Sequence, residues 1–122
     1  MTDRKITYLT DVALITCVVS VGRADAVIKA AQEMGATGAL VYHARGVGAR
    51  ERLGLLRIAI EADKEVVSIV VPADYQDVVF ESVYRAADLG QPGAGFAYIT
   101  PLEKMATYVP RVILERMQGE TG

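Results

Sequence analysis

Unbroken apolar runs and helix-spaced apolar residues alternate along this chain, and the alternation predicts a β-α-β-β-α-β order. An apolar run rich in β-branched residues is typical of a strand that is buried on both faces. Four such strands are predicted, at residues 12–19, 37–42, 65–71 and 96–99. Each is bounded by Gly, Pro or a cluster of polar residues, which are the usual turn signals.

Two stretches between these runs carry apolar residues at helical spacing. The first helix is expected over residues 23–34, and Gly35 ends it. The apolar residues at helical spacing in it are Val27, Ala30, Ala31 and Met34. The second is expected over residues 74–89, with Asp74 as its N-cap and Gly90 at its end. The apolar stripe predicted for the second helix consists of Val78, Val79, Val83, Ala86 and Ala87.

The remaining segments are read from local motifs. Thr100-Pro101-Leu102-Glu103 matches a capping box with proline at the first helical position, so a short helix is predicted there. Residues 1–11 form a polar lead that we expect to be loosely ordered, and residues 110–122 form a C-terminal tail. The domain itself is expected over residues 12–109, with a long loop at 44–63.

This order predicts an α+β, ferredoxin-like βαββαβ fold. Its two helices would cover one face of a four-stranded antiparallel sheet. The strands are too apolar to leave the other face in water, and 52% of all residues are hydrophobic. We therefore expect a partner subunit to cover that face, which makes the protein a homo-oligomer.

Composition excludes several classes of function. The net charge of −2 offers no footprint for nucleic acid. Cys17 is the only cysteine and lies in an apolar run, so no disulfide forms within the chain and a buried, unreactive thiol is expected. No stretch is long and apolar enough to cross a membrane. The polar N-terminus lacks a signal-peptide core, which predicts a cytoplasmic protein.

The most unusual stretch is residues 42–54, which places three glycines and three arginines inside ten residues. Gly46 and Gly48 would let the backbone turn with positive φ, and successive N–H groups in such a turn can bind an anion. Arg50 and Arg52 could add planar donors. An ordinary solvated hairpin loop would have the same composition, so both interpretations stay open here.

Five motifs in this order resemble the P-II nitrogen regulatory protein family, over about residues 12–105. They are Glu33-Met34-Gly35-Ala36-Thr37-Gly38, Arg45-Gly46-Val47-Gly48, Val71-Pro72-Ala73-Asp74, Gly93-Ala94-Gly95 and Pro101-Leu102-Glu103. The resemblance implies a homotrimer that acts in signal transduction and nitrogen regulation, with nucleotide-binding clefts between subunits. It also implies a T-loop, here residues 44–63, which docks onto a target protein according to the bound effector.

The resemblance further implies an adenine nucleotide, ATP, ADP or AMP, in the cleft. The implied ligand contacts are Val18 and Leu40 at the adenine, and Arg45, Gly46, Val47, Gly48, Arg50, Gly93 and Gly95 at the phosphates. We expect Arg50 to make the main charged contact and Arg45 the second. No metal is required.

The chain also departs from the family pattern. Positions that usually carry a lysine, threonine or arginine hold other residues here: Ser20, Leu40, Ala49, Phe96, Thr107 and Val109. Each charge-assisted contact is worth roughly 1.5–3 kcal/mol, so we expect weak nucleotide binding with little preference for a third phosphate. The loop has no Tyr or Ser between Gly46 and Lys64, so the family's modification sites are absent.

The leading hypothesis is a trimeric regulator of a partner protein, most simply a membrane transporter, that docks through residues 44–63. A metal-ion-handling trimer like the divalent-cation tolerance (CutA) family is the alternative, with His43 from three subunits meeting on an axis. An enzyme is the third class. No nucleophile–base pair or paired carboxylates stand out, so we do not expect the protein to be an enzyme.

Overall fold

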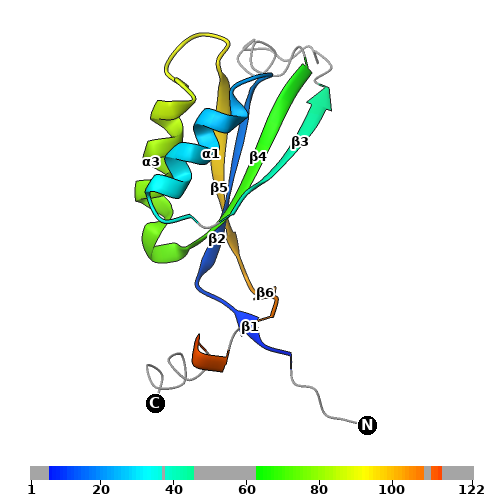
Figure 1. Ribbon diagram of the computed structural model, residues 1–122, viewed down its shortest axis with the longest axis vertical. Helices are drawn as coiled ribbons and strands as arrows, with labels where there is room; N and C mark the ends of the chain where they lie inside the picture. The colour runs from blue at the N-terminus through cyan, green and yellow to red at the C-terminus, as the bar shows by residue number, and fades with distance from the viewer. Residues whose placement is uncertain (1–5, 37, 46–62, 109–110, 114–122) are drawn as a thin grey trace.

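The computed structural model describes residues 6–36, 38–45, 63–108 and 111–113 (Figure 1). The predicted order of six elements is confirmed. They are strand β2 (Val12–Ser20), helix α1 (Ala24–Glu33), strands β3 (Leu40–Arg45) and β4 (Asp63–Pro72), helix α3 (Gln76–Ala86) and strand β5 (Gly95–Leu102). The result is a mixed α+β fold.

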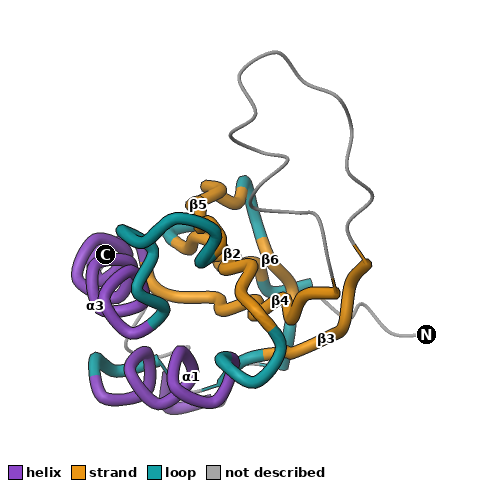
Figure 2. Tube along the Cα trace, turned by 90° about the horizontal axis from the view of Figure 1, so that it is seen from above, coloured by secondary structure: helices purple, strands orange, loops and turns teal. Residues whose placement is uncertain are grey.

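The four long strands form one antiparallel sheet in the order β3-β4-β2-β5. Figure 2 shows α1 and α3 together on one side of it. Paired residues on these strands always have the same parity, for example Thr16 with Ser68 and Tyr98. Because side chains alternate between faces, odd-numbered strand residues form the helix-side face and even-numbered ones form what we call the open face.

The core lies between the helix-side face and the two helices. It includes Ile15, Cys17, Val67 and Ile69 from the sheet, all fully buried. Val27 and Ala31 of α1 and Val79 and Val83 of α3 pack on them, as the helical stripes predicted. Cys17 is free and buried as expected, and burial raises the pKa of its thiol to about 12.

Two residues of the predicted apolar stripes are exposed rather than buried. Val78 and Met34 are 48% and 41% exposed, because each lies at the margin of its helix's apolar stripe. A hydroxyl instead links the two helices: Ser82 Oγ donates to the Ala30 carbonyl across 3.3 Å.

The start of the second helix also differs from the prediction. Residues Ala73–Tyr75 form a 3-10 turn (η1), α3 begins only at Gln76, and Asp74 is not its N-cap. The helix ends at Ala86 rather than at residue 89, and Asp88 just beyond it has a left-handed φ of 55°. The backbone of η1 is held instead by the Asp11 carbonyl, which accepts a hydrogen bond from Ala73 N at 2.8 Å.

The short helix expected from the capping box is wrong. Thr100, Pro101 and Leu102 continue β5, because they pair with Leu14, Ala13 and Val12 of β2. Long-range pairing outweighs the local motif here.

The described part of the polar lead contains a strand that was not expected. Tyr8–Leu9 form strand β1, which pairs antiparallel with strand β6 (Met105–Ala106) in a separate two-stranded sheet. In the main sheet, β3 runs to Arg45, so the pairing of Ala44 with Lys64 and Arg45 with Asp63 shortens the expected loop at both ends.

Candidate functional site

The predicted site residues gather mainly at one end of the main sheet, the upper end in Figure 1. There β2 ends, β5 begins, and β3 and β4 reach their common connection. The register aligns these ends, since Ser20 pairs with Lys64 and Val19 pairs with Gly95. Val18, Arg45, Gly93 and Gly95 all lie near this end. Gly46, Val47, Gly48 and Arg50 lie outside the described residues.

Gly95 has a structural reason to be glycine. Its φ is +132°, and a Cβ placed on it would lie 1.9 Å from the Val18 carbonyl oxygen. Gly93 also has positive φ, at 74°. The close approach brings the start of β5 against the end of β2, so Gly95 shapes the sheet end whether or not its backbone meets a ligand.

The other predicted contacts divide between the two faces. Val18 and Leu40 are even-numbered and lie on the open face, whereas Arg45 lies on the helix-side face opposite Asp63. Strand β4 separates Val18 from Leu40, and their rungs are two residues apart. From strand spacing and rise their Cα atoms are about 12 Å apart, so one subunit does not bring them together.

Lys64 is the charged residue that sequence reasoning missed. It lies on the open face between Ser20 and Ala44 and is only 5% exposed. Within the described part of the chain, its ammonium has no hydrogen bond or ion pair. The sequence indicates the position of Lys64 only weakly. Its alternation with Val66, Ser68 and Val70 assigns it to the open face, but without the strand register it looks like an ordinary polar residue at the start of a strand.

A pocket on the open face contains Leu40. Its volume is about 480 Å³, and it is lined by Leu14, Gly38, Ala39, Leu40, Ser68, Val70 and Met105. Ser68 brings the only polar side chain among these residues. Leu40 itself is 72% exposed. An apolar pocket with one hydroxyl suits a flat, largely apolar group.

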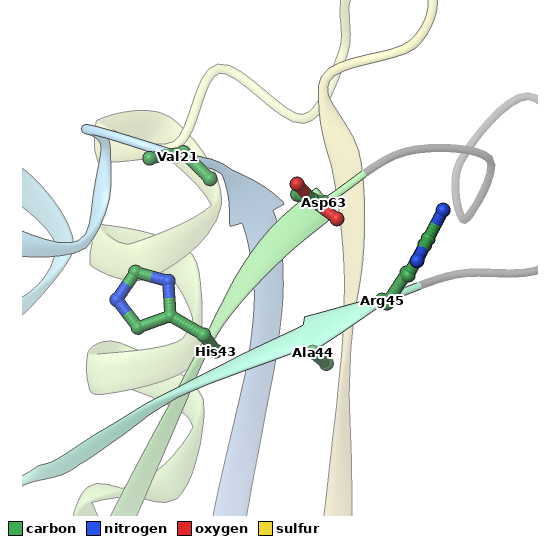
Figure 3. Close-up of a pocket in the computed structure, with 5 residues that line it drawn as sticks. All are labelled: Val21, His43, Ala44, Arg45 and Asp63. Atoms are coloured by element: carbon green, nitrogen blue, oxygen red, sulfur yellow. The ribbon is translucent and has the colours of Figure 1, made fainter.

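A second pocket, of about 410 Å³, lies on the other side of the sheet end (Figure 3). Its lining combines His43, Arg45 and Asp63 with Val21 and Ala44. Figure 3 shows the His43 ring below Val21, with Arg45 and Asp63 farther toward the strand ends. Arg45 therefore shares its surroundings with a carboxylate rather than with Val18 or Leu40.

Glu65 holds the backbone that follows Val21, which is one of the residues that line this second pocket. Its Oε1 accepts hydrogen bonds from Gly22 N at 2.8 Å and from Ala24 N at 3.1 Å. These backbone hydrogen bonds, first that of Ala24 and then that of Gly22, lower the pKa of Glu65, with a smaller contribution from His43. Residue Arg23 at the N-cap of α1 makes no side-chain cap, so Glu65 caps the helix from β4.

We expect Glu65→Ala to lower Tm at neutral pH, because α1 then loses its acceptor. The pKa of Glu65 is lowered in the folded state, so its contribution is complete above the unfolded value of 4.5 and is lost as pH falls through the folded value. Thermal unfolding from pH 7 to pH 3 should show the wild-type and Glu65→Ala curves converging only below pH 4.5. Glu103→Ala, which removes an exposed carboxylate, is the control. Equal Tm values for wild type and Glu65→Ala at pH 7 would contradict the capping role.

Other types of site are not found in the described residues. No group of three or more His, Cys, Asp or Glu side chains gathers there as metal ligands. None of the helices in that part of the chain is long and apolar enough to cross a membrane.

Comparison with known proteins identifies the family. The family model described as Nitrogen regulatory protein P-II matches residues 12–111. This chain belongs to the P-II family. P-II proteins are signalling regulators, so the match favours that class over the divalent-cation tolerance alternative, for which no support was found.

A solved P-II structure has a similar fold. The crystal structure of Arabidopsis thaliana PII bound to citrate matches with a TM-score of 0.59 and 21% identity. The match covers 77% of this chain and 79% of that one. No curated protein sequence matches significantly.

Proposed function

We propose that this P-II family member is a cytoplasmic, homotrimeric regulator rather than an enzyme. It binds a small anionic effector, an adenine nucleotide, between subunits. It then regulates a partner, a membrane transporter, through residues 44–63. Family membership supports the signalling class, and the geometry of the open face supports the effector.

Lys64 is the observation that carries the effector proposal. An ammonium group that is withdrawn from water without a counterion is costly, so buried charges are normally paired. Lys64 is 5% exposed, and no described residue pairs with it. An anionic ligand at the sheet end would supply the missing partner.

The separation of Val18 from Leu40 supports a cleft made by two subunits. One ligand can contact both positions if the pocket beside Leu40 in one subunit faces Val18 and Lys64 of the next. The base would then occupy the apolar pocket, and the phosphates would meet Lys64 and the backbone of Gly93 and Gly95. Arg45 lies on the other face of the sheet, so Lys64 is the better candidate for the charged contact to the phosphates.

The effector class can be tested by titration calorimetry with ATP, ADP, AMP, adenosine and citrate. Citrate is included because the solved P-II structure carries it. We expect weak binding of all three nucleotides with similar affinities, and little heat from adenosine. Absence of heat from every nucleotide at millimolar concentration would exclude an adenine nucleotide as the effector. Heat from citrate alone would leave a carboxylate anion as the effector.

The trimer is supported by the exposed apolar side chains of the open face and β3. No described helix covers them. Leu40 is 72%, Tyr42 49% and Tyr98 48% exposed. Patches of this kind on soluble proteins usually mark an interface.

We expect wild-type protein to sediment as a trimer at micromolar concentration and Tyr42→Glu to sediment as a smaller species. Tyr42 is half exposed in the single subunit, so the substitution should leave the fold intact while placing a charge in the interface. Tyr84→Glu is the matched control, since Tyr84 lies on α3 and is 45% exposed. A monomeric wild type would overturn the assembly.

The partner can be tested by membrane co-sedimentation from a lysate, with and without ATP or ADP. The apolar anchors expected in the docking segment, which lies outside the described residues, are Leu53, Leu55, Leu56, Ile58 and Ile60. Leu55 and Leu56 are chosen because Ile58 and Ile60 could instead extend the strand that follows. Leu55→Asp/Leu56→Asp should abolish nucleotide-dependent association with the membrane fraction. Association unaffected by this variant would exclude docking through these residues.

A further inference from the structure

The two-stranded sheet formed by β1 and β6, here called the ribbon, lies outside the main sheet. It has two rungs, Tyr8 with Ala106 and Leu9 with Met105. Lys104 Nζ lies over the Tyr8 ring, 4.6 Å from its centroid. Figure 1 shows the ribbon extending past the lower end of the main sheet, at the opposite end from the β3–β4 connection.

A ribbon of this size is not stable by itself. An isolated pair of strands is marginal in water unless an apolar face packs on something else. The apolar side chains around this one are open to solvent: Ile6 is 64%, Tyr8 44% and Tyr108 84% exposed. The ribbon therefore has the properties of an arm whose binding surface is not supplied by the described part of the chain.

Strand β3 offers a surface of matching chemistry. It is an edge strand that pairs only with β4 among the described strands. Its side chains are exposed on both faces, with Leu40 72%, Val41 40% and Tyr42 49% exposed. An exposed apolar edge readily accepts another strand. The other edge strand, β5, contains Pro101, which lacks the N–H that pairing needs.

We propose that the ribbon is a clasp that packs on the β3 edge of a neighbouring copy of this chain. A second copy is the favoured occupant because each chain carries both exposed surfaces, and the ribbon extends beyond its own main sheet. The two surfaces differ, so the contact is head-to-tail, and such contacts form a closed ring when the rotation between neighbours closes. A closed ring of three agrees with the trimer, and the clasp rests on that part of the proposed function.

The clasp has a consequence for the effector cleft. Met105 belongs to β6 and also lines the open-face pocket beside Leu40. The N-terminal residues, by pairing with Met105 and Ala106, hold that wall of the pocket. Seating of the ribbon on a neighbour thus supports one side of the site.

Cross-linking between two chains, each with one introduced cysteine beside the native Cys17, tests the clasp. One full-length chain carries Tyr8→Cys. The other carries a mass tag and Leu40→Cys, Val41→Cys or Tyr42→Cys, because a disulfide needs Cα atoms about 4.4–6.8 Å apart. The chains are refolded together and oxidised. Cys17 is buried with a raised thiol pKa, so it does not compete. Tyr84→Cys replaces the β3 cysteine in the control.

We expect a mixed disulfide-linked dimer with at least one β3 position and none with Tyr84→Cys. Sedimentation of the same samples separates the two hypotheses. A trimer without any Tyr8–β3 cross-link would overturn the clasp and leave the trimer standing. Equal cross-linking to Tyr84→Cys would also overturn the clasp, since collisions alone would explain it. A monomer would overturn both.

Discussion

Lys64→Met is expected to weaken binding of ATP, ADP and citrate by roughly ten- to a hundredfold. A charge-assisted contact is worth about 1.5–3 kcal/mol, and 1.4 kcal/mol corresponds to one decade in affinity. The same substitution should raise the Tm of the ligand-free protein. Methionine keeps the length of the side chain and removes a buried ammonium that no described residue neutralises.

This pair of opposite effects distinguishes a ligand contact from a structural role. If Lys64 only stabilised the fold, its replacement would lower the Tm of the protein. Lys29→Met is the control, because Lys29 is exposed on α1 and should change neither quantity. Calorimetry and thermal unfolding on both variants provide the measurements. Unchanged affinity together with a lower Tm for Lys64→Met would show that Lys64 is not the effector contact.

Gly95→Ala should be the most destabilising single substitution among those considered, at about 3–5 kcal/mol. The alanine Cβ would meet the Val18 carbonyl oxygen at 1.9 Å while the backbone keeps a φ of +132°. Backbone must move to relieve this contact, since no flexible side chain is involved. For a domain of this size, the loss corresponds to a fall in Tm of roughly 10–20 °C.

Gly22→Ala separates the steric contact from the backbone strain. Gly22 also has positive φ, +99°, but a Cβ placed there has nothing within 4 Å. Its cost should therefore be that of positive φ alone, about 1–2 kcal/mol. Chemical denaturation of both variants measures the difference. Similar losses for Gly22→Ala and Gly95→Ala would mean that the sheet end adapts to the extra atom.

The order of elements could be predicted because it depends on local periodicity. Val27 and Val79 follow helical spacing, and both are buried in the core. The errors arise where distant pairing overrides a local motif. Thr100-Pro101-Leu102-Glu103 reads as a capping box, yet three of these residues complete a ladder with β2. The strand at Tyr8–Leu9 depends on partners 98 and 96 positions away in the sequence, and no local pattern indicates such partners.

The site could be predicted only in outline. Glycine patterns and family motifs indicated the end of the sheet where β2 ends and β5 begins, and ligand binding there stays a prediction. They could not assign faces, since one residue of register decides whether a side chain points to the helices or away from them. Arg45 was therefore grouped with Val18, and Lys64 was overlooked. The pairing of Ala44 with Lys64 and of Arg45 with Asp63 places Lys64 on the open face and Arg45 on the helix-side face. Only the structure gives this register.

Lys64 and Glu65 are neighbours on β4 and point to opposite faces of the sheet. This arrangement limits where related sequences can carry insertions and deletions. Moving this strand by one position would send Glu65 away from α1 and Lys64 toward the core, so the helix cap and the proposed ligand contact would be lost together. Residues 63–72 should therefore tolerate no insertion or deletion. Residues 46–62, which join the last paired rung of β3 to β4, can gain or lose residues at little entropic cost, because closure entropy grows only with the logarithm of length. Insertions and deletions accumulated over evolution should therefore concentrate there, between two strands whose phase is fixed.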